Sequence, residues 1–198
     1  AEVTEGMLAK VRSALEVRDL SELSQQHDQV VVLREAVLAY LQHVGRAELS
    51  DAEADEHARL VAATGEIENM SAALSYELIP LAQTLKEGNT TPSKETTDLL
   101  ERLFQTIQAS AHSALRALVE HDEQAAQTVV ASRDAILELT SQFHRQQAVR
   151  LAGNEPDRLL KLRVQLEILD RLRRLYSVAE HMAISVLPRS VLVGELSA

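Results

Sequence analysis

The 198-residue chain contains no cysteine and no tryptophan, and aromatic residues make up only 3% of it. The absence of cysteine excludes disulfides, thiolate zinc sites and cysteine nucleophiles. Six glycines and four prolines leave little room for β-turns. With so few aromatic side chains, the core must consist of Leu, Val, Ile and Ala, a mixture that favours helices packed at close distance. These absences predict an all-α protein.

Charge and hydropathy exclude further classes of function. The net charge of −10 argues against nucleic acid as a partner, because neutralisation of phosphates supplies most non-specific affinity for it. The same charge disfavours broad docking on anionic lipid. No apolar run approaches the roughly 20 residues of a membrane span, and no signal peptide opens the chain. Because the chain begins with Ala1 rather than Met, we expect it to be a piece of a longer polypeptide.

Hydrophobic periodicity and capping residues predict six helices. Ser50 and Glu53 form a capping box at the start of the third helix, and Pro80 is expected to bend that helix. Thr91 is predicted to cap the fourth helix, with Pro92 at its first position. The expected helices cover about residues 4–18, a segment following Ser21, 50–86, 92–120, 122–151 and 156–186, with clear breaks at 88–92 and 153–156.

Two of these helices carry apolar stripes at helical spacing. The stripe of the second helix consists of Val30, Leu33, Val37 and Leu41. The stripe of the sixth helix consists of Leu159, Leu162, Leu166, Leu169, Leu172, Tyr176 and Ala179. Pro188 is expected to end the sixth helix, and the apolar tail that follows could pack on a second copy of the chain.

The two halves of the sequence show a repeat with a period near 105 residues, which indicates a duplicated three-helix unit. Asp19 matches Asp122 at a separation of 103. Three apolar positions match at a separation of 106: Val30, Leu33 and Val37 with Ile136, Leu139 and Phe143. Three more match at 105: Met70, Ala73 and Leu74 with Leu175, Val178 and Ala179. The predicted organisation is a first repeat at 1–90, a second at 91–188 and a tail at 189–198.

Acidic side chains four residues apart share a helix face and are the first candidates for metal ligands. The acid-rich stretch at 65–82 fails this test, because Met70 follows Glu66 and Ala72 follows Glu68 at that spacing. The pairs that pass are Asp51/Asp55, Glu53/His57 and Asp134/Glu138. Acids in the first turns of a helix are also expected simply against the helix dipole. Asp51, Asp55, His57 and Glu68 are therefore weak metal candidates, and no metal or cofactor is expected.

Catalytic motifs find no support, so the chain is not expected to be an enzyme. No Gly-x-Ser-x-Gly turn or Gly-rich phosphate loop occurs, and the seven histidines show no ligand spacing. The remaining feature is a basic cluster in the sixth helix: Arg158, Lys161, Arg163, Arg171, Arg173 and Arg174. Its arginines suit carboxylate or phosphate partners. Acid-before-base pairs, such as Glu167/Arg171 and Asp170/Arg174, offer the alternative of internal ion pairing.

Two segments of the chain resemble one family. EIENMSAALSYELIPLAQTLKEGN at 66–89 resembles the third helix of PhoU-like domains, and LEILDRLRRLYSVAEHMAISVL at 166–187 resembles the matching helix of the second half. The closest version is the cytoplasmic C-terminal domain of bacterial sodium/phosphate cotransporters. The Leu-Arg-Arg-Leu run of 172–175 and Ser177 match that version in particular. The resemblance covers nearly the whole chain and implies two tandem three-helix antiparallel bundles.

The resemblance also implies a function, but this sequence departs from the family's metal-binding motif in both halves. PhoU proteins bind metal clusters through an acidic residue followed four positions later by Asp, whereas here Ala72 follows Glu68 and Ser177 follows Arg173. The implied role is regulation of phosphate transport at the cytoplasmic side of the inner membrane. The implied partner is the membrane transport portion of the same polypeptide, with Arg171, Arg173 and Arg174 as the docking face. The alternatives are a stand-alone PhoU-type signalling adaptor and a metal-binding helical bundle.

Overall fold

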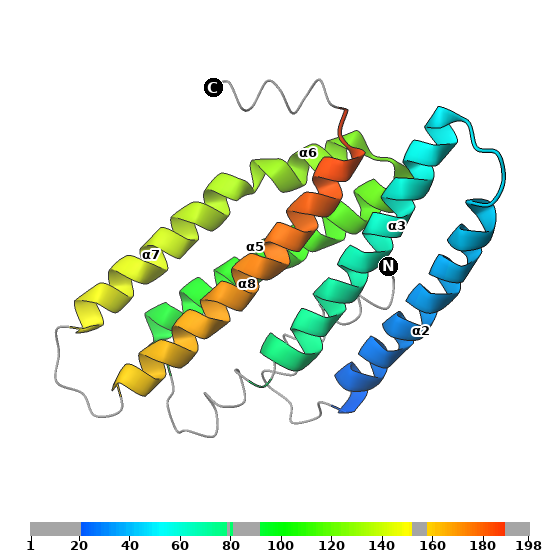
Figure 1. Cartoon of the computed structure of the whole chain (residues 1–198). Coiled ribbons are helices and arrows are strands. Elements are labelled where there is room, and N and C mark those ends of the chain that lie inside the picture. Colours follow the sequence, from blue (N-terminus) through cyan, green and yellow to red (C-terminus); the bar gives the residue numbers. More distant parts are fainter. Residues whose placement is uncertain (1–20, 79, 81–91, 152–157, 189–198) are drawn as a thin grey trace. The chain divides into compact units, whose positions relative to one another are not determined.

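The computed structural model describes residues 21–78, 80, 92–151 and 158–188 (Figure 1). The prediction of an all-α protein is confirmed for these residues, which form helices and their connections and include no strand. The chain divides into two compact units, Ala1–Tyr76 and Glu77–Ala198. The described elements are α2 (Ser21–Val44), α3 (Asp51–Ala72), the π-helix η1 (Ala73–Leu78), α5 (Lys94–Glu120), α6 (Glu123–Ala131), α7 (Arg133–Leu151) and α8 (Arg158–Val186).

The described part of the first unit is an antiparallel pair of helices, α2 and α3 (Figure 1). Val30 and Leu41 of α2 and Met70 of α3 are buried in this unit. The predicted capping box is present, since the Ser50 hydroxyl accepts from the Glu53 amide and the Glu53 carboxylate accepts from the Ser50 amide. This reciprocal bonding satisfies two backbone donors and fixes where α3 begins.

The helix loses α-helical geometry just before Pro80. The chain passes from α3 into the π-helix Ala73–Leu78, so that the residue four positions before the proline, Tyr76, lies in the widened segment. Proline lacks an amide donor and its ring collides with the carbonyl four residues back, and a π-type turn is one way in which a helix accommodates such a collision. The prediction that Pro80 disturbs the third helix therefore agrees with the π-helical segment that precedes it.

The second unit is built around the contact between α5 and α8, with α6 and α7 packed against them (Figure 1). Small side chains dominate the deepest layer: Ala111 and Ala114 of α5 and Ala179 and Ala183 of α8 are completely buried. Larger residues such as Ile107 and Leu175 fill the remaining space. Alanine allows two helix axes to approach closely, so this core matches the expectation drawn from the scarcity of aromatic residues.

One predicted helix start in this unit is wrong, and one predicted helix is interrupted. Thr91 and Pro92 do not start α5: its N-cap is Ser93, whose hydroxyl accepts from the Thr96 amide, because Ser93 has the extended backbone that an N-cap requires. The predicted helix at 122–151 is two helices, α6 and α7, separated at Ser132. At this break the Val129 carbonyl accepts hydrogen bonds from the Ser132 hydroxyl and from the Tyr176 hydroxyl of α8.

Both predicted apolar stripes are only partly buried. Val30 and Leu41 of α2 are buried, but Leu33 and Val37 are 54% and 43% exposed. In α8 the stripe divides along its length: Leu169, Leu172, Tyr176 and Ala179 are buried, Leu162 and Leu166 are half-buried, and Leu159 is 75% exposed. Helical periodicity identifies an apolar face, but neighbouring helices decide how much of that face is covered.

Several predictions fall on residues outside the described part of the chain. They are the helix at 4–18, the end of the third helix near Lys86, the breaks at 88–92 and 153–156, the boundary between residues 90 and 91, and the tail at 189–198. Among the described residues, no helix is long and apolar enough to cross a membrane.

Candidate docking surface on helix α8

Helix α8 has two halves with different surroundings. Its second half carries Leu172, Leu175, Ala179 and Met182, all buried, and this part of the helix belongs to the core of the second unit. Its first half exposes two adjacent leucines, Leu159 and Leu160, at 75% and 54%. The first half is therefore an apolar ridge that the described helices of the unit leave open.

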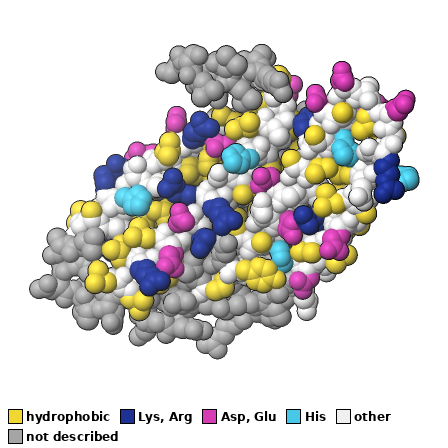
Figure 2. Space-filling model, in the orientation of Figure 1, with side chains coloured by type: hydrophobic (Ala, Val, Ile, Leu, Met, Phe, Trp, Pro, Cys, Tyr) yellow, Lys and Arg dark blue, Asp and Glu magenta, His cyan; other side chains and the backbone are white. Residues whose placement is uncertain are grey.

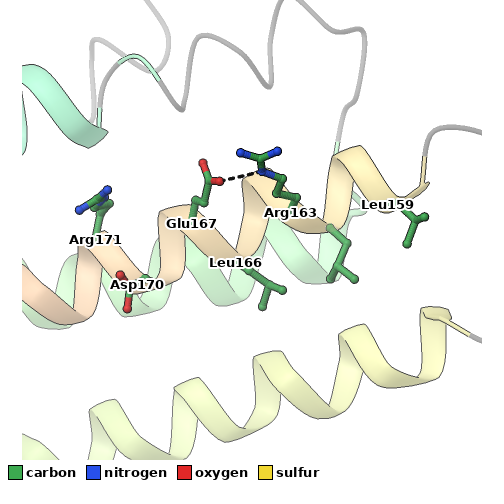
Figure 3. A pocket seen from close by; sticks show the side chains of 7 residues that line it. Leu159, Arg163, Leu166, Glu167, Asp170 and Arg171 are labelled. Carbon is green, nitrogen blue, oxygen red and sulfur yellow. Dashed lines mark hydrogen bonds and ion pairs between the residues drawn. The ribbon is translucent and has the colours of Figure 1, made fainter.

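An open groove of about 400 Å³ follows this half of α8 (Figure 3). We call it the α8 groove; it is lined by Leu159, Leu162, Arg163, Leu166, Glu167, Asp170 and Arg171. The lining residues recur at spacings of three and four, so they form one face of the helix. Three leucines supply its apolar part and four charged side chains supply its rim.

The charged rim is partly paired within α8. The Arg163 Nε donates to a Glu167 carboxylate oxygen at 3.0 Å, and Figure 3 shows both side chains on the same side of the helix as Arg171. Such an exposed pair four residues apart contributes only about 0.2–0.5 kcal/mol. It orients the two groups at the edge of the groove without making either unavailable to a partner.

The arginines predicted as a docking face lie at and beyond one end of the α8 groove. Arg171 is half-buried and lines the groove, whereas Arg173 and Arg174 are exposed. Arg171 and Arg174 each have an interaction partner, while Arg173 forms no ion pair with any described residue. Residues 159–174 contain five basic and two acidic side chains, a local excess of three positive charges in a chain whose net charge is −10.

Hydrophobic and charged side chains alternate on the surface that carries α8. Figure 2 shows yellow apolar patches between dark-blue Lys and Arg side chains on this face. The sequence pattern grouped Leu159, Leu162 and Leu166 with the buried residues of the same apolar stripe and so did not identify them as groove residues. The available signal was the proximity of Leu159 and Leu160 to the basic residues Lys161 and Arg163, since charged side chains are rarely found fully buried.

The weak metal candidates are not brought together. Asp51 and Asp55 are exposed in the first turns of α3, and Glu68 lies 13 residues beyond Asp55 on the same helix, about 20 Å along its axis. The His57 Nε2 donates to the Leu41 carbonyl at 2.8 Å, which joins α3 to α2. In the described ranges, no three His, Asp or Glu side chains are grouped as ligands for a metal ion.

Glu68, one of the weak metal candidates, makes a contact between helices. The Arg34 Nε of α2 lies 2.7 Å from a Glu68 carboxylate oxygen, with both side chains about one third exposed. One turn further along α3, the buried Ser71 hydroxyl donates to the Glu68 carbonyl. That hydroxyl has only one proton, so it accepts from the His27 Nδ1, which lies 2.9 Å away. These polar contacts connect α2 to α3 and were not predicted from the sequence.

A second unpredicted polar network lies in the second unit at the break between α6 and α7. The buried Tyr176 hydroxyl of α8 donates to the Val129 carbonyl at 3.0 Å and lies 3.1 Å from a Glu180 carboxylate oxygen. Glu180 also accepts from the Arg133 Nε at 2.8 Å. Burial raises the pKa of Tyr176 to about 12, an increase to which the nearby Glu180 charge adds. The network holds α8 against the start of α7.

Comparison with known proteins identified no relative: no family model matches the chain, and no curated protein matches it.

Proposed function

We propose that the chain is a PhoU-like regulatory domain of a sodium-dependent phosphate cotransporter, located at the cytoplasmic side of the inner membrane. It acts by docking and not by catalysis. Through the α8 groove it contacts the transport portion of the same polypeptide and transmits the phosphate status of the cell. The observation that carries this proposal is the open first half of α8, where exposed leucines lie beside a local excess of positive charge.

The proposed duplication has support in the burial of matched positions. Met70, Ala73 and Leu74 are buried in the first unit, and their counterparts Leu175, Val178 and Ala179 are buried in the second. The match is weaker for the preceding helix, because Leu33 and Val37 are exposed whereas Leu139 and Phe143 are buried. The burial of matched positions therefore agrees better between the third helices of the two proposed repeats than between their second helices.

The polar contacts between helices support the same register. His27 of α2 contacts Ser71 of α3, and the residues 106 and 105 positions later are Arg133 and Tyr176. These two belong to the network that joins α7 to α8 through Glu180. In each proposed repeat, polar side chains at matched sequence positions therefore connect the second helix to the third. The chemical groups differ, but their positions agree.

Sodium-dependent uptake of radiolabelled phosphate tests this function. Cells would carry the natural gene, or the same gene lacking the codons for residues 1–198, and would be grown with scarce or abundant phosphate. The proposal predicts that removing the domain changes the response of uptake to phosphate supply. An unchanged response would contradict it. The coding sequence before Ala1 separates the alternatives, since hydrophobic spans there indicate the cotransporter and an adjacent start codon indicates the stand-alone adaptor.

A further inference from the structure

The shape of the α8 groove limits the kind of partner that it fits. Leu159, Leu162 and Leu166 follow one another at spacings of three and four, over about 10 Å of the helix axis. Such a ridge packs into the groove of a second helix whose own apolar residues have the same spacing. No strand occurs among the described residues, so they offer no sheet edge to which an extended segment could add. The apolar part of the surface therefore fits an amphipathic helix.

The charge beside the α8 groove limits the partner further. The groove lining itself holds two basic and two acidic side chains, and the local positive excess comes from Lys161, Arg173 and Arg174 next to it on the same helix. Arg163 and Arg173 are both exposed, and Arg173 has no acidic partner among the described residues. The local excess of three positive charges would be repelled by a basic segment and attracted by an acidic one. A second copy of the chain is disfavoured as the occupant, because two molecules with a net charge of −10 repel each other overall.

We infer that the α8 groove binds an amphipathic helix whose apolar stripe is flanked by Asp or Glu side chains. Leu159, Leu162 and Leu166 contact the apolar stripe, and Arg163 and Arg173 pair with the acids at its edges. The inference rests on the proposed docking function and names the chemistry of the partner. It is specific, because a segment rich in Lys and Arg would be repelled by this surface.

The test uses the 198-residue chain and two designed peptides. Both peptides have about 20 residues and the same leucine stripe, but one carries Glu and the other Lys beside it. Fluorescence anisotropy measures their affinities. The Glu peptide should bind about tenfold more tightly than the Lys peptide, and its advantage should decrease as salt screens the charges.

Matched variants show whether the peptide binds at the α8 groove. The groove variant combines Leu159→Gln with Arg173→Glu and should weaken binding of the Glu peptide about tenfold. The control combines Val119→Gln with Arg102→Glu, which alters an exposed apolar residue and an exposed arginine on α5, and should leave the affinity unchanged. Because all four side chains are exposed, circular dichroism should show equal helicity for both variants. Equal losses in the two variants would overturn the inference.

The failure of this inference can be distinguished from the failure of the proposed function. Tighter binding of the Lys peptide, or binding of neither peptide, would overturn the acidic helix as the partner. Association of the chain with itself through this face, detected by sedimentation and abolished in the groove variant, would also overturn it. None of these results bears on whether deleting the domain changes the response of phosphate uptake, which tests the function separately.

Discussion

His27 and Ser71 form a buried polar contact between α2 and α3, in which the Ser71 hydroxyl is the acceptor for the His27 Nδ1. The His27 side chain is 7% exposed and Ser71 is fully buried. The Ser71 hydroxyl uses its proton on the Glu68 carbonyl, and so it remains an acceptor for the imidazole. A buried donor that loses its acceptor costs more than an average hydrogen bond contributes, which makes this residue pair a sensitive test of the first unit.

Replacement of Ser71 by Ala should destabilise the first unit by about 1–3 kcal/mol, because the His27 Nδ1 donor then remains buried without an acceptor. Hydrogen exchange of the α2 and α3 amides measures the change segment by segment. Thr64→Ala is the matched control on the same helix, since among the described residues the Thr64 hydroxyl bonds only to the Leu60 carbonyl one turn back. Similar protection in the two variants would contradict the described contact.

Tyr176 gives the second unit a dependence on alkaline pH. The pKa of Tyr176 is about 12 in the folded protein, whereas that of a tyrosine in an unfolded chain is about 10. Between these values the unfolded chain loses the proton that the folded chain retains, so stability should fall as pH rises from about 10 to about 12. Below pH 10 this contribution is fully present.

The variant Tyr176→Phe should lower the stability of the second unit by about 1 kcal/mol at neutral pH, because the hydroxyl bonds to Val129 and Glu180 are lost. It should also show a smaller loss of stability between pH 10 and 12 than the natural chain. Urea denaturation followed by circular dichroism measures both effects. Tyr40→Phe, at a 66% exposed tyrosine, serves as the control and should match the natural chain at each pH.

At the scale of helices, local sequence signals located most of the elements and missed those features that depend on distant residues. The capping box at Ser50 and the end of α5 at Glu120 were predictable, because they depend on residues adjacent in sequence. The break at Ser132 was not, since one of its hydrogen bonds comes from Tyr176, 44 residues away in sequence. The exposure of Leu33 and Leu159 was not predictable either, because the pattern of one helix does not show what packs against it.

Substitutions at Ser93 and Thr91 show which of these two residues caps the start of α5. Ser93→Ala should lower the stability of the second unit by about 1 kcal/mol, since the Thr96 amide loses its acceptor at the N-cap. Thr91→Ala should have no more than a few tenths of that effect. Urea midpoints of the two variants provide the comparison. A larger loss for Thr91→Ala would restore the boundary that the sequence predicted.

At the scale of the whole molecule, the acids considered as metal ligands contact another helix or lie at the surface. Glu68 pairs with Arg34 between helices, and Asp51 and Asp55 lie exposed at the start of α3. The sequence predicted that Glu68 has no paired acid on its own helix, because no acid follows it at a spacing of four. Only the structure identified the partner of Glu68, since Arg34 lies on a different helix and no local pattern joins the two residues.

Elemental analysis of protein purified without a metal-affinity tag should therefore find less than about a tenth of an equivalent of any transition metal, because no described acid or histidine group provides the several ligands that a specific site needs. One equivalent or more per chain would contradict this expectation. Asp51, Asp55, His57 and Glu68 would then be the residues to replace in order to locate the site.

The central claim is that the chain regulates phosphate transport by docking through the α8 groove, and phosphate uptake in cells tests it most directly. Cells would express the natural full-length protein with either Leu159→Gln and Arg173→Glu or the control pair Val119→Gln and Arg102→Glu, at equal protein levels. The account predicts that only the groove variant reproduces the altered response to phosphate supply seen when the domain is removed. A normal response in the groove variant, with an altered response in the domain deletion, would contradict it.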